Sequence, residues 1–372
     1  MEILKADKNE YDLVQRFLEE VYGHSYNFFP SNYPHVWTED TVEYKNTFII
    51  KENNKIVSLV RLFPLNLIID SIKIKIGGIG GVSTSYECRG KGYMRSLMNA
   101  VISEMKSQKY PVSILWGDRH RYKNFGYENA GDIVVEVCIT PRGLEKMKID
   151  PIDAKRYSGE KEILKKIIES YNKHPIRKER SKEEFSKILT KQGVSTYYGI
   201  EKNNFGYVSI QVGEFVAEYG GTPEIILKIL KYLNKRFGTP RFLIHFPKIS
   251  LIPPEILNVA SWWHNKISAG MIKIISLKNI LDIYKENFKE NLSDGEEITF
   301  IIENKESVIV QNLNGKIQTK EGKGKNQICL KEQEMIRLLF SSPDWFLFNK
   351  RIFRTLNSIL PFEIFVWPLD HI

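Results

Sequence analysis

A short glycine-rich turn between a strand and a helix constrains this chain more than any other feature. Residues 82–101, VSTSYECRGKGYMRSLMNAV, begin with strand-forming residues, pass through Gly90 and Gly92, and continue as an amphipathic helix. Glycine permits backbone angles that other residues avoid, so successive N–H groups can converge on one point, where the helix also presents its positive end. The N–H groups from Arg89 to Met94 are therefore expected to bind a phosphate.

Hydrophobic periodicity places this turn inside a mixed sheet. Apolar positions with helical spacing predict an opening helix over Tyr11–Val21, and a hairpin follows that turns at Asn53 and Asn54. A second hairpin arm, NLIIDSIKIKIGGIGG, leads to the glycine turn. The helix after the turn stops before Pro111, and VSILWG then predicts a buried strand. The first 140 residues thus predict the order helix, antiparallel strands, glycine turn, helix and strand.

A weaker repeat of this pattern follows in the chain. TYYGIEKNNFGYVSIQV repeats the Asn-Asn hairpin, EFVAEYGG resembles the central strand, and a helix that ends at Pro240 precedes the strand RFLIHFP. Residues 220–223, GGTP, stand where the first copy has its basic glycine loop. If the repeat is an internal duplication, it has lost the ligand loop. Chance similarity between two α/β units is the alternative.

A third pattern begins at about Gly270. A strand and a helix are followed by short strands with a turn at Asn314 and Gly315, and then by another helix. These elements predict an α+β module of about 100 residues. The predicted fold class is therefore α/β with mixed sheets, in two tandem units followed by an α+β module.

Composition narrows the class of protein. The 372 residues carry 54 Lys and Arg against 45 Asp and Glu, but the two signs alternate, as in KERSKEEFSKILTKQ. A solvated surface is therefore expected, and no nucleic-acid partner. Three widely spaced cysteines, Cys88, Cys138 and Cys329, indicate neither a disulfide framework nor a metal site and suit a cytoplasmic protein. No apolar run reaches the roughly 18 residues of a membrane span, so no membrane partner is expected.

Three kinds of phosphate-binding loop compete as explanations of the turn. The dinucleotide fingerprint needs GxGxxG with an acidic residue about 20 positions on, and the P-loop needs GxxxxGK[ST]; neither pattern occurs. The acyl-CoA turn of the GNAT acetyltransferase superfamily has the pattern R/Q-x-x-G-x-G/A. Residues 87–92 match both of its glycines, with Glu87 in place of the usual Arg or Gln. That departure matters little where backbone N–H groups contact the diphosphate.

The whole chain resembles the enhanced intracellular survival (Eis-like) branch of this superfamily. The stretches GGVSTSYECRGKGYMRSLM and ILWGDRHRYKNFGY carry the resemblance, together with the degenerate second copy and a C-terminal module similar to sterol-carrier domains. The resemblance implies N-acetyl transfer from acetyl-CoA to a primary amine by direct attack, without a metal. It also implies an acetyl-CoA-binding GNAT domain over 1–145, a degenerate GNAT-like domain over 146–268 and a sterol-carrier-like domain over 269–372.

By position, the resemblance assigns the acetyl-CoA site to the strand and the turn. In the family, the strand backbone pairs with the pantetheine arm and polarises the thioester carbonyl. One well-placed donor of this kind can be worth about 3 kcal/mol. The cofactor-binding residues implied are Val82, Ser83, Thr84, Arg89, Gly90, Lys91, Gly92, Tyr93 and Met94.

The resemblance also implies two groups that move protons. Tyr122 stands where the family has the tyrosine that protonates the departing CoA thiolate, and its reference pKa of about 10 suits a donor. Tyr127 is the second choice, and simple packing is the alternative for Tyr122. The terminal carboxylate, here that of Ile372, would take the proton of the amine, which requires burial to raise its pKa.

Other residues are candidates for the base or for the walls of an acceptor pocket. Glu87, Asp118 and His120 are predicted to be surface or capping residues. The aromatic loop YGHSYNFFPSNYPHVW could wall the acceptor pocket, or it could be packed by its own aromatic side chains. The acceptor-facing residues predicted from this loop are His24, Tyr26 and Phe28, and His24 is also a candidate base.

Two rival functions stay open. The chain could be a non-catalytic acyl-CoA-binding or regulatory protein that keeps the turn without acetyl transfer, although Tyr122 argues against this. It could also carry a lipid in its C-terminal module. The acceptor itself, whether a protein lysine, a polyamine, an aminoglycoside or another small amine, is not specified by the residues. Members of the family form hexamers, so the resemblance allows a homo-oligomer.

Overall fold

The computed structural model describes residues 2–130, 133–267, 270–341 and 350–371. They form a mixed α/β fold, which confirms the predicted fold class, and the chain divides into two compact units. The first unit comprises Met1–His24, Glu43–Asp132 and Ala269–Ile364. The second comprises Ser25–Val42, Ile133–Ser268 and Phe365–Ile372.

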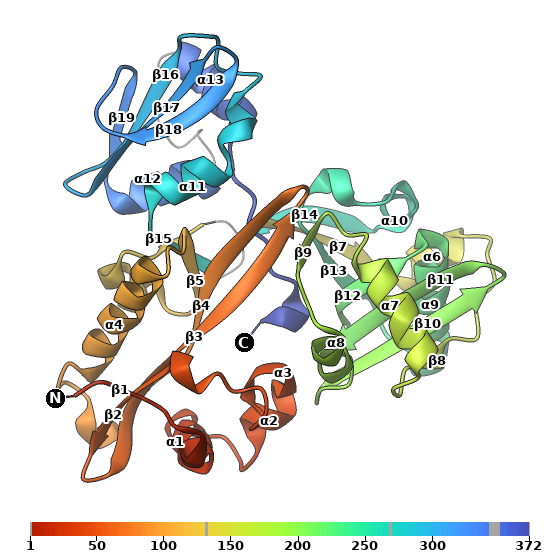
Figure 1. Cartoon of the computed structure of the whole chain (residues 1–372). Coiled ribbons are helices and arrows are strands. Elements are labelled where there is room, and N and C mark those ends of the chain that lie inside the picture. The colour runs from red at the N-terminus through yellow and green to blue at the C-terminus, as the bar shows by residue number, and fades with distance from the viewer. Residues whose placement is uncertain (1, 131–132, 268–269, 342–349, 372) are drawn as a thin grey trace. The chain divides into compact units, whose positions relative to one another are not determined.

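In the sheet of the first unit, β4 pairs in parallel with β5, whereas β5 and β6 each pair with β15 in the antiparallel sense. β2, β3 and β4 form a meander, and β4 pairs with β5 in parallel (Figure 1). The hairpin between β2 and β3 turns at Asn53 and Asn54, both with positive φ, as predicted. In sheet order the strands are β1 (Leu4–Lys5), β2 (Thr47–Glu52), β3 (Lys55–Ile69), β4 (Ile72–Thr84), β5 (Val112–Trp116), β15 (Gly270–Ile274) and β6 (Glu128–Asn129).

β3 is longer than the sequence indicates, because it continues through a proline. Pro64 pairs with Gly77 of β4, whereas β2 pairs with β3 only as far as Arg61. The missing proline N–H therefore lies beyond the end of the β2 ladder, where no bond to that strand is lost. The two predicted hairpins are thus one continuous meander.

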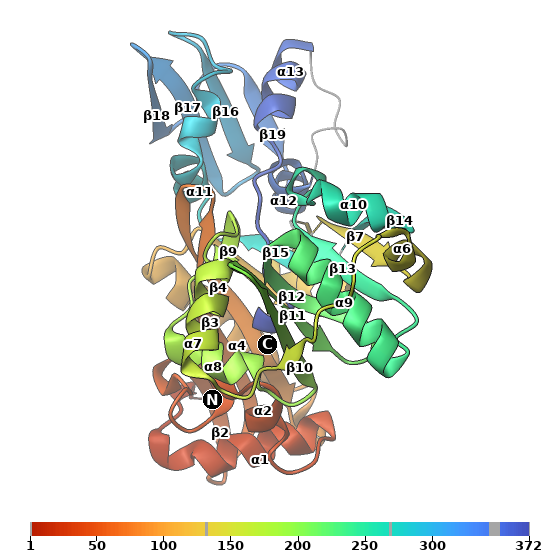
Figure 2. The same cartoon turned by 90° about the vertical axis from the view of Figure 1, so that its right-hand side faces the viewer.

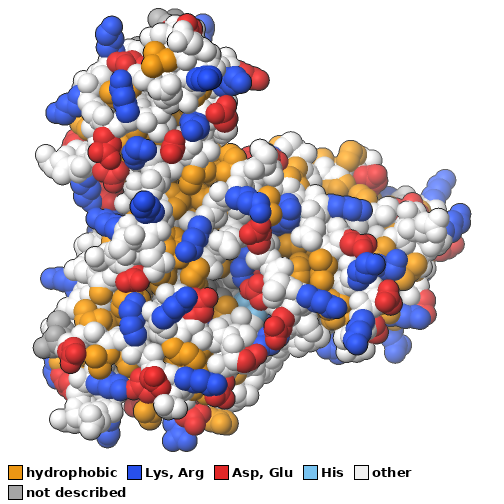
Figure 3. All heavy atoms as spheres, viewed as in Figure 1, with side chains coloured by type: hydrophobic (Ala, Val, Ile, Leu, Met, Phe, Trp, Pro, Cys, Tyr) orange, Lys and Arg blue, Asp and Glu red, His pale blue; other side chains and the backbone are white. Residues whose placement is uncertain are grey.

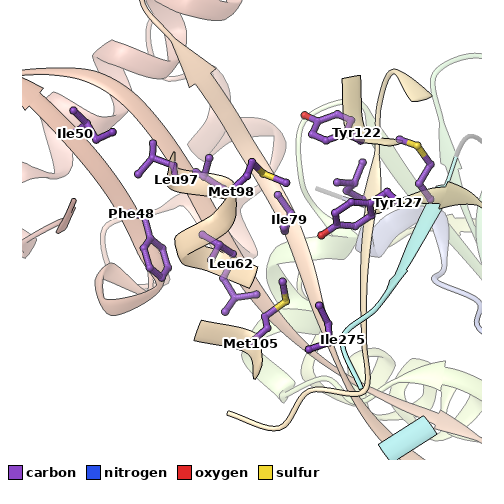
Figure 4. Packing of buried hydrophobic residues seen from close by; sticks show 14 of the residues in the cluster. Phe48, Ile50, Leu62, Ile79, Leu97, Met98, Met105, Tyr122, Tyr127 and Ile275 are labelled. Carbon is purple, nitrogen blue, oxygen red and sulfur yellow. The ribbon is translucent and has the colours of Figure 1, made fainter. Parts of the chain in front are cut away.

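Helix α4 (Tyr93–Ser107) covers one face of this sheet and shields its core. Leu97, Met98 and Met105 are fully buried against strand residues such as Leu62 and Ile79 (Figure 4). Helix α1 (Tyr11–Tyr22) lies on the other face (Figure 1) and ends at Gly23, whose φ is +70°. Both helices agree with the predicted amphipathic patterns to within a residue or two.

The second unit repeats this topology. β10, β11 and β12 form an antiparallel meander, β12 pairs with β13 in parallel, and α9 (Pro223–Phe237) packs on β10 and β11 (Figure 2). The Asn-Asn hairpin and the helix before Pro240 fall where the predicted repeat places them. The sheet order is β14 (Trp262–Ile267), β7 (Ile133–Ile139), β13 (Phe242–Phe246), β12 (Phe215–Gly221), β11 (Asn204–Gln211), β10 (Val194–Glu201) and β8 (Lys155–Arg156).

Each sheet is completed by a strand that the sequence repeat would assign to the other copy. β15 follows the second copy in the chain, yet it pairs with β5 and β6 of the first sheet. β7 lies within the first 145 residues, yet it pairs with β13 and β14 of the second sheet. The boundaries 1–145, 146–268 and 269–372 stay a prediction, but the compact units of the structure are not contiguous segments of sequence.

The C-terminal α+β module belongs to the first unit. Its four-stranded sheet has the order β18 (Lys316–Glu321), β17 (Glu306–Leu313), β16 (Glu297–Ile302) and β19 (Gln327–Leu330). The β17–β18 hairpin turns at Asn314 and Gly315, as predicted. Phe288, Phe300 and Met335 are fully buried in this module. Its helices include α11 (Leu277–Ile283), α12 (Glu332–Phe340) and α13 (Lys350–Ile359).

The surface agrees with the mixed charge pattern of the sequence. On the face that Figure 3 shows, Lys and Arg side chains are interspersed with Asp and Glu instead of gathering in one stripe. Among the described residues, no helix is both long enough and apolar enough to cross a membrane.

Candidate active site

One cavity in the first unit gathers most of the residues predicted to bind the cofactor. Its volume is about 840 Å³, within the roughly 300–1,000 Å³ of ligand pockets. The end of α1, the end of β4, the glycine turn, the start of α4 and the segment after β5 form its walls. The predicted residues in the lining are Val82, Ser83, Thr84, Arg89, Gly90, Gly92, Tyr93 and Met94.

The glycine turn leaves backbone donors available at this cavity. Gly90 and Gly92 have φ of +83° and +82°, and a Cβ on either would meet no atom within 4 Å. The N–H of Ser96 donates to the Gly92 carbonyl oxygen at 3.1 Å. Because a helix leaves its first N–H groups without helical acceptors, those that precede Ser96 in α4 can face a ligand. The expectation was wrong for Arg89, whose N–H donates to the carbonyl oxygen of Tyr86 at 3.2 Å.

β4 presents an open edge beside the turn. β4 pairs with β5 at Gly77 with Ser113 and at Gly78 with Ile114. No pair between the two strands is described beyond Gly78, so the edge of β4 is open from there on. On the other side, the register with β3 shifts between Leu59 and Arg61, which is a β-bulge. A strand edge of this kind can hydrogen-bond an extended ligand as an added strand would.

Charge in the cavity favours an anion. Its lining holds Arg89, Arg95 and Arg121 and, among the described residues, no acidic side chain. The Lys91 ammonium is turned away from this lining and pairs with the Glu52 carboxylate at 3.1 Å. Hydrogen bonding to Glu52 raises the pKa of Lys91. In the part of the chain that the structure describes, no cluster of His, Cys, Asp and Glu could hold a metal ion.

Tyr122 lies beside the cavity, in helix α5 (Arg119–Tyr122). Its side chain is 6% exposed, and its ring covers Gly117, where a Cβ would approach the ring to 2.6 Å. Burial raises the pKa of the Tyr122 phenol, with Arg121 opposing the rise. The phenol is therefore protonated at neutral pH, as a proton donor must be.

Tyr22, at the end of α1, is a functional candidate that the sequence did not reveal. Its hydroxyl donates to the Val82 carbonyl oxygen at 3.0 Å, and the residue lines the cavity. Burial first, and then the nearby charge of Tyr122, raise the pKa of Tyr22 to about 12. No local sequence pattern marks Tyr22 as a lining residue, because Val82, whose carbonyl oxygen it contacts, lies 60 residues further along the chain.

Tyr127, the second choice as donor, has its hydroxyl engaged elsewhere. It is fully buried and lies 2.8 Å from the Ser113 hydroxyl, which itself donates to the Gly77 carbonyl oxygen at 2.7 Å. Figure 4 shows Tyr122 and Tyr127 as neighbours, with ring centroids 6.3 Å apart. Tyr127 thus joins the Ser113 side chain, which links β5 to β4, and its hydroxyl is already engaged there.

Glu87, Asp118 and His120, the other candidate bases, lie at surface or capping positions. Glu87 and His120 are exposed, and the Asp118 carboxylate caps α5 by accepting from the His120 N–H at 2.7 Å. This cap agrees with the prediction of a surface or capping residue at Asp118. None of these three side chains is among the described residues that line the cavity.

The three residues predicted from the aromatic loop do not line one pocket among the described residues. His24 belongs to the first unit and stacks on Tyr22, with ring centroids 6.1 Å apart. Tyr26 and Phe28 belong to the second unit, where Tyr26 is 82% exposed and Phe28 packs edge-to-face on Phe29. The roles of these residues toward an acceptor stay a prediction.

Ile372 lies outside the described residues, but the segment just before it is fixed within the second unit. Asp370 is fully buried, and its carboxylate accepts two hydrogen bonds from Arg180 at 2.8 and 2.7 Å. Burial alone would raise the pKa of Asp370, but the charge of Arg180 outweighs it and the pKa is lowered. The Trp367 indole N–H donates to the Ile176 carbonyl oxygen at 3.0 Å.

The second copy lacks the donors of the first at the equivalent turn. The N–H of Thr222 donates to the Phe205 carbonyl oxygen at 2.8 Å, and Pro223, which begins α9, has no N–H. Gly221 packs so closely on Phe205 that a Cβ would collide with its carbonyl oxygen. This supports the prediction that the second copy has lost the ligand loop.

Five further lining residues come from segments that the sequence did mark, and Val21 and Cys88 also line the cavity. Arg95 and Asn99 are one turn apart on α4, on the face that does not pack into the core, so helical periodicity could have identified them. Arg121, Asn124 and Phe125 belong to α5 and to the short helix Lys123–Phe125 that follows it, within the stretch that carries the family resemblance.

Comparisons with known proteins agree with this geometry. Residues 2–130 match the model of the acetyltransferase (GNAT) domain. Similar solved structures include a GCN5-related N-acetyltransferase from Kribbella flavida, with 14% identity, a TM-score of 0.70 and both chains fully covered. A conserved protein of unknown function from Enterococcus faecalis V583, described as a probable N-acyltransferase, has 16% identity and a TM-score of 0.75 over 100% of this chain and 99% of that one.

A third similar structure is Eis1 from Mycobacterium abscessus, with 9% identity, a TM-score of 0.68 and both chains fully covered. At these identities the likeness is one of fold, and a comparison with curated proteins finds no sequence match. Residues 2–130 therefore match the GNAT acetyltransferase domain, and the fold of the whole chain is like that of the solved structures named above.

Proposed function

We propose that this protein transfers an acetyl group from acetyl-CoA to a primary amine by direct attack. The observation that carries the proposal is the glycine turn, whose backbone donors open onto the cavity. Three arginines line this cavity, and no acidic residue among those described does. Such a turn suits the CoA diphosphate, and the open edge of β4 at Val82–Thr84 suits the pantetheine arm. The family match and the similar solved structures support acyl transfer as the reaction class.

In the proposed reaction, the amine nitrogen attacks the thioester carbonyl carbon while a β4 N–H stabilises the developing oxyanion. The C–S bond then breaks, and the phenol of Tyr122 donates its proton to the CoA thiolate. The raised pKa of Tyr122 keeps that proton in place until the thiolate forms. The proton released by the amine passes to water.

A thiol-release assay tests this function. Purified protein is mixed with acetyl-CoA and, in turn, spermidine, an aminoglycoside and a lysine peptide, and free CoA thiol is followed. The expected result is thiol release above the hydrolysis background with at least one amine, together with the acetylated amine by mass spectrometry. CoA binding without thiol release from any amine would instead support an acyl-CoA-binding or regulatory protein. Co-purified lipid in native mass spectrometry would support the lipid-carrier alternative.

Tyr122→Phe should lower kcat about 100-fold, because positioned general acids contribute roughly 10²–10⁴-fold. The affinity for CoA should stay close to that of the unchanged protein, since the proposed CoA contacts at the glycine turn and at the β4 edge are left in place. Steady-state kinetics and calorimetric CoA titration measure the two quantities. Tyr22→Phe is the matched variant, and a smaller loss is expected because the Tyr22 hydroxyl already donates to Val82. A Tyr122→Phe protein with weak CoA binding would show that the residue is structural.

A further inference from the structure

Helix α12 of the C-terminal module lies against the segment that carries Tyr122. The side-chain amide of Gln333 donates to the Lys123 carbonyl oxygen at 3.3 Å, and an Arg337 guanidinium nitrogen lies 4.0 Å from the Glu128 carboxylate. Both ends of this segment, just after Tyr122 and at β6, therefore touch α12. All of these residues belong to the first unit.

The closest part of this contact is at Gly126. Its φ is +84°, and a Cβ there would collide with the Glu332 carboxylate and would lie 2.6 Å from the Lys273 ammonium. The Glu332 carboxylate accepts from Lys273 at 2.8 Å and from Lys305 at 2.5 Å. An ion pair between α12 and β15 thus sits directly on the backbone of the turn after Tyr122.

This ion pair is largely removed from solvent, unlike the pairs at the surface. The side chains of Lys273 and Glu332 are 7% and 11% exposed, whereas that of Lys305 is 51% exposed. Burial lowers the pKa of Lys273, and the charge of Glu332 opposes that shift. Removing one member of a buried pair leaves an uncompensated charge, so the contact at Gly126 depends on both.

Backbone hydrogen bonds connect the turn at Gly126 to Tyr122. The N–H of Gly126 donates to the Lys123 carbonyl oxygen at 3.0 Å, and the N–H of Tyr127 donates to the Tyr122 carbonyl oxygen at 3.3 Å. Tyr127 is itself anchored to Ser113 of β5. A shift at Gly126 therefore moves the residue that carries the phenol.

We propose that Glu332 is a positioning residue for acyl transfer: with Lys273 it fixes the turn at Gly126, and through that turn it fixes the place of the Tyr122 phenol. The inference rests on the proposed role of Tyr122 as proton donor. It makes the C-terminal module part of the catalytic unit, in addition to any other role the module has.

Hydrogen exchange measured by mass spectrometry tests this positioning role, and it needs no amine substrate. In Glu332→Gln, amides in residues 118–127 should exchange about tenfold faster, because their local opening becomes easier. Peptides covering 86–96 should be unchanged. Glu290→Gln, an exposed acid of the same module, is the matched control and should change neither region. If Glu332→Gln does not fold, Gln333→Ala replaces it, with a smaller change expected in the same peptides. Unchanged exchange at 118–127 would overturn the proposal.

A double-mutant cycle separates positioning from general stability. With acetyl-CoA and the panel amine that gives the fastest thiol release, Glu332→Gln should lower kcat about tenfold and leave the KM for acetyl-CoA unchanged. In the Tyr122→Phe background the same substitution should lower kcat no further. Equal losses in both backgrounds would overturn the positioning role and leave Tyr122 as donor. A Tyr122→Phe enzyme with full kcat would overturn the proposed donor and this inference with it.

Discussion

A chain that ends at residue 145 is expected not to fold as a stable domain, although the sequence places a boundary there. Such a chain lacks β15, which lies between β5 and β6 in the first sheet. Met271, Ile272 and Ile274 of β15 are at most 4% exposed. Each buried side chain of this size is worth roughly 1.5–3 kcal/mol, so their loss is comparable with a total stability of about 5–15 kcal/mol.

The register of β15 suggests a matched control for this truncation. Met271 pairs with Asn129 and Ile272 with Glu128, so residues 130 and 270 can be joined by a short Asn-Gly turn. A chain of residues 1–130, this turn and residues 270–364 should be soluble and should unfold in one cooperative thermal transition, measured by circular dichroism. The chain of residues 1–145 should show none. Equal melting of the two chains would contradict the exchange of strands between the sheets.

Gly92→Glu should weaken CoA binding by at least about 100-fold in a calorimetric titration. The backbone at Gly92 has φ of +82°, which strains any other residue, and the new side chain would extend from the turn into open space. Its carboxylate would meet the anionic diphosphate, and like charges brought together cost several kcal/mol. Gly92→Ala separates backbone strain from charge and should bind CoA more tightly than Gly92→Glu does.

Gly238→Glu provides the matched control. Gly238 ends α9 in the second unit, its φ is +66°, and a Cβ there would also meet no atom within 4 Å. The same strain and the same charge are introduced far along the chain from the glycine turn, so CoA affinity should be unchanged. Equal CoA affinity in Gly92→Glu and Gly238→Glu would remove the turn from the cofactor site.

Sequence patterns predicted the helices and turns whose structure depends on neighbouring residues in the chain. The opening helix extends one residue beyond its predicted end, and the hairpins turn at Asn53–Asn54 and Asn314–Gly315 because these residues tolerate positive φ. The glycine turn was recognisable for the same reason, since both of its glycines adopt left-handed angles.

What the sequence did not reveal depends on partners that are distant in the chain. β15 was predicted as a strand, but its place between β5 and β6 is set by pairing across more than 140 residues. The Lys91 side chain was expected at the ligand, yet it pairs with Glu52, 39 residues earlier. The bonds from Tyr22 to Val82 and from Gln333 to Lys123 are of the same long-range kind.

A crystal structure of the protein with CoA tests the central claim most directly. The account predicts that the diphosphate oxygens lie about 3 Å from the backbone nitrogens of the turn and of the first residues of α4, with the pantetheine arm along the open edge of β4. A nucleotide bound in another part of the molecule, with the N–H groups of Gly92, Tyr93 and Met94 facing only water, would contradict it.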